Sequence, residues 1–266
     1  MKYQGILVYK GKSQLDGENI IAVATKDTKN EKTGDAIQIW ILRGDIGPII
    51  AKRLGYDFSI CGNCPLRDVK VCYCNLCHGP LQVFKAYHND RYEKLNDTNI
   101  EFFRDKEVRL GAYGDPTAVP ISIWDKIAEV SNSILAYTHQ WNKPEFQEYK
   151  KYCMASTEDP ISYKKAQELD WRTFNVKLPN EPLFENEYRC PASKEAGVLT
   201  TCSKCQSCKG LSSEIKKSVA IDFHGDGIND YKLQRFMKFR KAKKNKKKWR
   251  IDFSKRIQLI KELCKI

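Results

Sequence analysis

The sequence predicts an α/β protein with a TIM-like barrel, complete or partial, preceded by an N-terminal β region and carrying cysteine-rich metal-binding loops. Two observations predict this class. Short apolar runs are rich in β-branched residues, and from Val108 onward such runs alternate with helical patterns. Alternating strands and helices form parallel sheets with right-handed crossovers. The chain has 266 residues, of which 41% are hydrophobic, so it can bury a large core.

Residues 1–60 are predicted to form the β region that packs on the barrel. Three runs separated by polar turns have the composition of strands: 5–9, 19–24 and 37–42. A cysteine-rich loop then extends from Cys61 to Pro80. After it, residues 81–95 have the apolar spacing of an amphipathic helix.

Residues 61–231 are predicted to form the barrel-like catalytic domain. Its helices are expected to begin at Pro120 and at Pro160, the second one capped by Asp159 and ending near Leu169. Its strands are expected at 108–113, 133–137, 151–155, 172–176 and 220–223. Active sites of such folds form at the carboxyl ends of the strands.

Three of the strand-end loops carry candidate catalytic side chains. Asp115, His139 and the pair Glu158 and Asp159 each follow a predicted strand. A carboxylate held rigidly there could attack a substrate while a second acid moves protons. Each of these residues could equally be a turn, cap or packing residue. The neighbouring residues expected to bind the substrate are Tyr113, Gly114, Gln140 and Trp141.

Nine of the eleven cysteines lie in two clusters. In a reducing compartment, clustered cysteines indicate metal rather than disulfides. The second cluster has the spacing Cys-x11-Cys-x2-Cys-x2-Cys, and four thiolates can enclose zinc or hold a 4Fe–4S cluster. The predicted ligands are Cys190, Cys202, Cys205 and Cys208.

The first cluster offers more candidate ligands than one site needs. In one arrangement, three cysteines hold a metal or iron–sulfur site with a position open for a substrate or cofactor: Cys61, Cys64 and Cys72. In another, a closed zinc shell is formed by Cys72, Cys74, Cys77 and either His78 or His88. The third possibility is a set of thiols that bind no metal.

The excess positive charge is confined to the last 35 residues. The net charge is +13, and residues 1–231 are neutral. Residues 232–266 are predicted to be a basic helical segment, in which cations interleave with Phe236, Phe239 and Trp249. Such a segment fits nucleic acid, with DNA favoured over RNA, or else a solubilising tail. The residues expected to bind nucleic acid are Arg240, Lys241, Lys243, Lys244, Lys246, Lys247, Lys248, Trp249 and Arg250.

Several familiar motifs are missing from the sequence. No GxGxxG, GxxxxGK[ST], HExxH or GxSxG segment is present, so nicotinamide redox chemistry, nucleotide hydrolysis and serine hydrolysis lose their usual support. No apolar run is long enough to span a membrane, and residues 1–14 lack the pattern of a signal peptide. We therefore expect a cytoplasmic protein with no membrane partner.

Blocks of the sequence resemble a phage and bacterial group known as gene product 88. The resemblance covers roughly residues 33–210 and rests on KTGDAIQIWIL, SICGNCPLR, RLGAYGDP, YTHQW, MASTEDP, CPASKEAG and TTCSKCQSC. It includes Asp115, His139 and the four cysteines of the second cluster. From the first cluster it includes Cys61, Cys64 and Cys72. Cys74, Cys77 and the basic tail lie outside it.

The chain is also distantly similar to two enzyme superfamilies. The tRNA- and DNA-guanine transglycosylases are barrels with an Asp nucleophile, an Asp base and a late cysteine-rich zinc site, but their signature segments are not present. Radical S-adenosylmethionine enzymes are barrels with an early Cys-x3-Cys-x2-Cys cluster. The spacing from Cys61 to Cys72 differs from that pattern.

The first functional hypothesis is a nucleic-acid base-modifying enzyme that exchanges guanine as the transglycosylases do. The resemblance implies that Asp115 attacks the sugar C1′ and that Asp159 or Glu158 moves the proton, while Trp141 or Tyr113 stacks on the flipped base. The second hypothesis is an iron–sulfur radical enzyme that uses S-adenosylmethionine, with a catalytic cluster on the first three cysteines and an auxiliary one on the last four. The third is a zinc-containing nucleic-acid-binding protein without catalysis.

Overall fold

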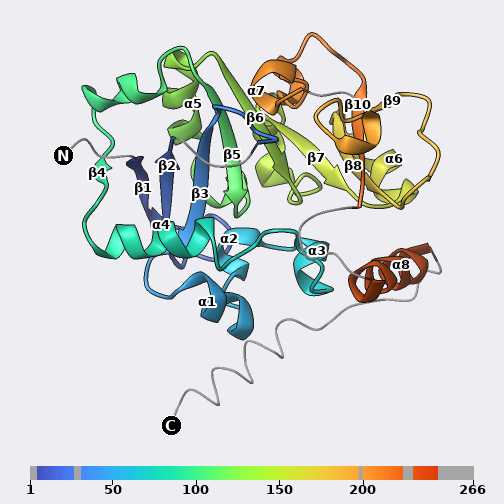
Figure 1. Cartoon of the computed structure of the whole chain (residues 1–266), viewed down its shortest axis with the longest axis horizontal. Helices are drawn as coiled ribbons and strands as arrows, with labels where there is room; N and C mark the ends of the chain where they lie inside the picture. Colours follow the sequence, from blue (N-terminus) through green and yellow to red (C-terminus); the bar gives the residue numbers. More distant parts are fainter. Residues whose placement is uncertain (1–4, 27–30, 198–199, 224–229, 245–266) are drawn as a thin grey trace.

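A computed structural model describes residues 5–26, 31–197, 200–223 and 230–244 (Figure 1). The described strands form one mostly parallel sheet with the order β4-β1-β2-β3-β5-β6-β7-β8-β10-β9. The strands are β1 (Gly5–Lys12), β2 (Asn19–Thr25), β3 (Ile37–Arg43), β4 (Glu93–Lys94), β5 (Glu107–Tyr113), β6 (Ser133–Thr138), β7 (Cys153–Thr157), β8 (Thr173–Lys177), β9 (Glu187–Arg189) and β10 (Ser218–Asp222). The α/β class is therefore confirmed.

Helices of very different lengths connect these strands. The α-helices are α1 (Pro48–Leu54), α2 (Phe58–Cys61), α3 (Pro65–Asp68), α4 (Gly79–His88), α5 (Ile121–Val130), α6 (Pro160–Glu168), α7 (Cys202–Cys205) and α8 (Asp230–Lys244). Short 3-10 helices lie at Asn99–Phe103, Pro116–Ala118, Pro144–Lys151, Lys194–Ala196 and Gly210–Ser212.

The sheet is open, so a complete barrel is not formed. Closure would require the two edge strands to pair with each other. Instead, within the described chain, β4 pairs with β1 and β9 pairs with β10, and Figure 1 shows β4 and β9 at opposite ends of the sheet. Strand β3 joins the two parts of the sheet. It pairs antiparallel with β2, which in turn pairs antiparallel with β1, and on its other side it pairs parallel with β5.

The parallel strands are buried on both faces at the centre of the sheet. Every residue of β7 and of β10 is buried, as is typical of strands covered on both sides. Trp124 of α5 and Ile37 of β3 are fully buried in the main core. This rigid centre fixes the loops at both ends of the strands.

The helix expected over 81–95 is shorter than predicted. It ends at His88, and Asp90 then adopts a left-handed conformation with φ 52°. A left-handed residue terminates helical hydrogen bonding. Residues 93–94 leave the helical path and pair with β1 as strand β4.

Helix α8 is folded against the rest of the molecule. Phe236 and Phe239 are buried against Leu66, Val69 and other apolar side chains near α3, and Figure 1 shows α8 beside α3. These two rings, which interleave with the cations in the sequence, are therefore used in packing and are not exposed for stacking on nucleic-acid bases. Trp249 and the helix expected to end at Ile266 lie outside the described residues.

Candidate metal centres and the cavity between them

The first cysteine group, Cys61, Cys64, Cys72 and Cys74, lies at the carboxyl ends of the parallel strands. Cys61 is the last residue of α2 and Cys64 is the N-cap residue of α3. Arg67 of α3 donates a hydrogen bond of 2.7 Å to the carboxylate of Asp57, which directly precedes α2, and both side chains are buried. This ion pair fixes the two short helices relative to each other.

The thiols of this group lie close enough to perturb one another. Burial raises the pKa of Cys61, and the charges of Asp57, Cys64 and Cys72 raise it further. A hydrogen bond with Cys74 lowers the pKa of Cys72 to about 6. Cys77 is exposed, and its contacts do not link it to this group within the described chain.

A histidine–carboxylate pair lies beside the first cysteine group. The Nε2 atom of His139 is 2.6 Å from the Oε1 atom of Glu158 and 4.0 Å from the sulfur of Cys64. Burial alone would lower the pKa of His139, but the negative charges of Cys64 and Glu158 outweigh it and raise that pKa well above its usual value. The neighbouring sulfur and carboxyl group therefore favour the protonated form of the imidazole.

Asp115 is buried and its carboxylate is occupied by hydrogen bonds. It accepts from the backbone N–H and the hydroxyl of Thr117, from the hydroxyl of Thr138 and from the backbone N–H of His139. These bonds tie the end of β5 to the end of β6. The described contacts give Asp115 a positioning role for His139.

Asp159 caps α6, as expected from its place before Pro160. Its carboxylate accepts hydrogen bonds from the backbone N–H groups of Ile161 and Ser162 and from the Ser162 hydroxyl. The cap satisfies helix donors that would otherwise lack partners. Glu158 points elsewhere, to His139, so the two neighbouring acids have different surroundings.

The residues expected to bind a substrate are packed into the protein. Trp141 is buried and donates from its indole N–H to the carbonyl of Ser156. Gln140 is fully buried, and its amide donates to the carbonyl of Cys61. Tyr113 is buried near the first cysteine group. Gly114 has φ +86°, and a Cβ atom there would lie 2.7 Å from the Cβ atom of Ile41.

The second cysteine group comprises Cys190, Cys202, Cys205 and Cys208, and it lies toward the amino ends of β5 and β6. The adjacent Gln206 donates to the carboxylate of Glu107, the first residue of β5, and the backbone carbonyl of Cys208 accepts from Ala136. Figure 1 shows α7, which carries two of these cysteines, beyond one end of the strands, whereas α2 and α3 lie beyond the other end.

The four thiols of the second group also influence one another. Burial raises the pKa of Cys208 to about 12, and the charges of the other three members contribute to this increase. Burial likewise raises the pKa values of Cys190 and Cys202. The four side chains therefore lie near one another. Even so, among the described residues no group of three or more His, Cys, Asp or Glu side chains is arranged to hold a metal ion.

One cavity of about 420 Å³ connects the two cysteine groups. Cys74 of the first group lines it, as do all four members of the second. Inward-facing residues of the parallel strands form its wall: Gln38, Trp40, Arg109, Ala112, Leu135, Tyr137, Phe174, Val176, Val219 and Ile221. In the described chain, the lining does not include Asp115, His139, Glu158 or Asp159.

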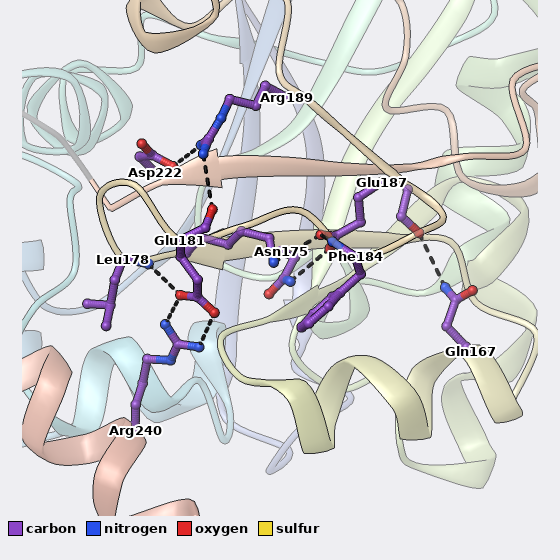
Figure 2. A network of polar contacts seen from close by, with 11 residues as sticks. Gln167, Asn175, Leu178, Glu181, Phe184, Glu187, Arg189, Asp222 and Arg240 are labelled. Atoms are coloured by element: carbon purple, nitrogen blue, oxygen red, sulfur yellow. Dashed lines mark hydrogen bonds and ion pairs between the residues drawn. The ribbon is translucent and has the colours of Figure 1, made fainter.

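The basic segment is described only in part. Arg240 donates to both carboxylate oxygens of Glu181, at 2.8 Å to Oε1, so its guanidinium is already engaged (Figure 2). In the same network, Arg189 connects Asp222 of β10 with the backbone carbonyl of Glu181. Lys241 is exposed on α8. The remaining predicted nucleic-acid contacts lie where side chains are not described: Lys243, Lys244, Lys246, Lys247, Lys248, Trp249 and Arg250.

Sequence reasoning missed Arg109, although a signal for it exists. Arg109 interrupts a strand in which Val108, Leu110 and Ala112 are buried. A charged residue inside an otherwise apolar strand indicates a polar environment on the opposite face of that strand. Without the cavity, the identity of that environment could not be deduced.

Comparisons with protein-family models, with curated proteins and with solved structures find no match to this chain. The resemblances seen in the sequence therefore stay predictions. In the described part of the chain, no helix combines the length and apolar character needed to cross a membrane.

Proposed function

We propose that this protein is an iron–sulfur enzyme that uses two clusters and transforms its substrate in the cavity between them. One cluster would be held by Cys61, Cys64 and Cys72, and the other by the second cysteine group. A single observation carries the proposal: the cavity lined by all four cysteines of the second group is also lined by Cys74, whose thiol makes a hydrogen bond with Cys72 of the first group. Cys61, Cys64 and Cys72 would hold their cluster behind Cys74, because they are not themselves on the described lining. The open sheet would then serve as a partial barrel around the substrate.

The chemistry of the donor set fits such clusters. Gathered thiolates repel one another and are poorly solvated when buried, as the raised pKa values of Cys61 and Cys208 indicate. Iron bound to thiolates removes both penalties, because metal binding replaces the protons and neutralises the negative charge. In a 4Fe–4S cluster each thiolate binds a different iron, so the ligand sulfurs lie farther apart than the four sulfurs around a single zinc ion.

The surroundings of the first group suit a redox centre with an open position. A bound cluster would supply single electrons to a molecule in the cavity. The positively charged imidazole of His139 would stabilise the thiolate of Cys64, and Glu158 would hold that imidazole in place. Hydrogen bonds of this kind tune the reduction potential of a cluster.

This arrangement favours the iron–sulfur hypothesis over base exchange by Asp115. A carboxylate nucleophile needs a lone pair directed at the substrate. The Asp115 carboxylate is directed at Thr117, Thr138 and His139 instead. Asp159 is similarly engaged in capping α6.

The test is metal analysis of protein purified or reconstituted without oxygen. We expect iron and acid-labile sulfide for two clusters. The triple variant Cys61→Ser/Cys64→Ser/Cys72→Ser should lose one cluster, and Cys202→Ser/Cys205→Ser/Cys208→Ser the other. The exposed Cys77→Ser variant is the matched control and should retain both. Zinc in both groups without sulfide would contradict the proposal and favour the zinc-containing nucleic-acid-binding protein.

A second assay examines S-adenosylmethionine as co-substrate. With dithionite present and no other substrate, two electrons and one proton convert it to methionine and 5′-deoxyadenosine. We expect this cleavage to require Cys61, Cys64 and Cys72 but not the second group. No cleavage by protein with a full complement of iron would exclude S-adenosylmethionine as the electron acceptor.

We further propose that the basic segment brings nucleic acid, most simply DNA, to the mouth of the cavity. Helix α8 packs on Leu66 and Phe223, which also line the cavity. Replacing Lys246, Lys247 and Lys248 by Gln should reduce the slope of log K against log salt by up to about 2.7, at about 0.9 for each phosphate contact. An unchanged slope would contradict this role.

A further inference from the structure

Arg109 projects from β5 into the cavity between the two cysteine groups. Its Nη1 atom donates a hydrogen bond of 3.2 Å to the amide oxygen of Gln38. Gln38 is itself buried and is fixed by donating from Nε2 to the carbonyl of Ala36. The guanidinium is therefore held in a defined position on the cavity wall.

The charge of Arg109 is not balanced by a carboxylate in the described part of the chain. No ion pair joins it to Asp or Glu there, and the titratable side chains near it are those of Tyr73, Tyr137, Cys202 and Cys74. A guanidinium carries five N–H donors, and among the described residues the bond to Gln38 is the one that uses a donor of Arg109. The one carboxylate on the lining, Asp222, already pairs with Arg189.

Aromatic side chains make up much of the remaining wall. Trp40, Tyr73, Tyr137 and Phe174 line the cavity, and the rings of Tyr137 and Phe174 lie 4.2 Å apart between centroids. A volume of about 420 Å³ is within the range of pockets that take small organic molecules. A planar ring can pack against such a wall, while a guanidinium binds carboxylate or phosphate through two parallel hydrogen bonds.

We propose that the cavity binds an organic oxyanion with a planar ring, and that Arg109 binds its carboxylate or phosphate group. As a statement about the substrate of the enzyme, this rests on the proposed function. As a binding site, it depends only on Arg109, Gln38 and the aromatic wall. Carboxylate and phosphate share the recognition chemistry, and the choice of probes separates them.

Arg109 has one competing role, which the experiment must distinguish. It lies near Cys74 and Cys202, so its charge could serve only to stabilise thiolates or clusters. In that case, replacing it would remove metal and leave anion binding unchanged. The two roles therefore predict opposite results for the metal content and for the ligand affinity.

The experiment measures calorimetric binding of two matched probe pairs to the full-length protein. Guanosine 5′-monophosphate is compared with guanosine, and 2-aminobenzoate with 2-aminobenzamide, so that each pair differs in its anionic group. We expect the anionic member of at least one pair to bind about tenfold or more tightly than its neutral partner. The pair that shows the difference identifies phosphate or carboxylate.

Three variants assign this difference to Arg109. Arg109→Gln should remove the preference for the anion while leaving the affinity for the neutral probe unchanged. Arg109→Lys retains the charge without the planar fork and should give an intermediate preference. The exposed Arg53→Gln on α1 is the matched control and should bind as the wild type does. Arg109→Lys also serves as the test if Arg109→Gln does not fold.

Iron and sulfide are measured on the same samples. The inference is overturned if neither anion is preferred, or if Arg109→Gln retains the preference, with or without loss of metal. If the preference depends on Arg109 but the protein contains only zinc, the anion site stands and the iron–sulfur proposal fails. The two ideas can therefore fail separately.

Discussion

The two cysteine groups differ in what surrounds them, although both reach the same cavity. The first is built from short helical turns and lies beside the buried Asp57–Arg67 pair and the His139–Glu158 pair. The second consists of four cysteines around α7, with the cations Arg109 and Lys32 nearby. The first group is therefore flanked by two pairs that include buried carboxylates, whereas the cations Arg109 and Lys32 flank the second.

The thiols respond to these surroundings in different ways. In the first group, a hydrogen bond with Cys74 lowers the pKa of Cys72 while burial raises that of Cys61. In the second group, burial raises the pKa values of Cys190, Cys202 and Cys208. Within the first group, the pKa of one thiol, Cys72, is therefore lowered, whereas in the second group the resolved shifts of Cys190, Cys202 and Cys208 all favour the protonated thiol. This suits a reactive centre in the first group and a closed auxiliary centre in the second.

The largest expected effect is on the free energy of unfolding, and it should differ between a ligand variant of the second group and one of the first. Cys208→Ser should destabilise the metal-loaded protein by about 3 kcal/mol or more, because loss of a ligand from a closed metal site removes folding free energy. Cys64→Ser should have a smaller effect, since its site lies at the end of the sheet and has an open position. Denaturant unfolding measures both variants. Equal losses would remove the distinction between the groups.

The second largest effect should come from breaking the Asp57–Arg67 ion pair, which fixes the two short helices that carry Cys61 and Cys64. Asp57→Ala removes the buried carboxylate that pairs with Arg67, while the contact of Arg67 with the partly exposed Asp68 remains, so we expect a loss of about 3 kcal/mol or less. Metal should be lost from the first group before the second, as measured by iron content of the folded fraction. Asp97→Ala, on the exposed surface, is the control. Loss from the second group first would contradict the assignment.

The Asp115→Asn variant tests whether Asp115 positions His139 beside the first cysteine group. The amide has one acceptor oxygen where the carboxylate has two, so a donor from Thr138 or His139 loses its partner. We expect a loss of about 1–3 kcal/mol in the free energy of unfolding. Asp170→Asn, at an exposed position, should lie within about 0.5 kcal/mol of the wild type. If Asp115→Asn is as stable as that control, the positioning role is wrong.

The smallest effect should come from the contact between α8 and Glu181. Burial tends to raise the pKa of Glu181, but hydrogen bonds from Arg240 and Leu178 outweigh it and lower that pKa. The contact therefore contributes stability above the unfolded pKa of about 4.3, and this contribution is lost as the pH falls through the folded value.

Glu181→Gln should weaken docking of α8 by about 1 kcal/mol near pH 7. Hydrogen exchange of the α8 amides measures this change, and it should vanish below the folded pKa. The exposed Glu185→Gln is the control. Exchange that is unaffected by Glu181→Gln at neutral pH would show that the Arg240–Glu181 contact does not hold the helix.

Features set by local sequence could be predicted, and features set by distant contacts could not. The alternating apolar runs predict the parallel strands, and Asp159 before Pro160 predicts the cap of α6. The openness of the sheet could not be deduced, because it depends on the pairing of β4 with β1 and of β9 with β10. Similarly, Arg240 looks available in the sequence, and only the fold brings Glu181 to it.

The most direct test of the central claim is the electron paramagnetic resonance spectrum of fully reduced protein prepared without oxygen. Two reduced iron–sulfur clusters on one cavity should broaden each other's signals by spin–spin interaction. The spectra of Cys64→Ser and Cys208→Ser should each show one unbroadened cluster. A single cluster signal in the wild type, or no signal from protein that contains only zinc, would contradict the account.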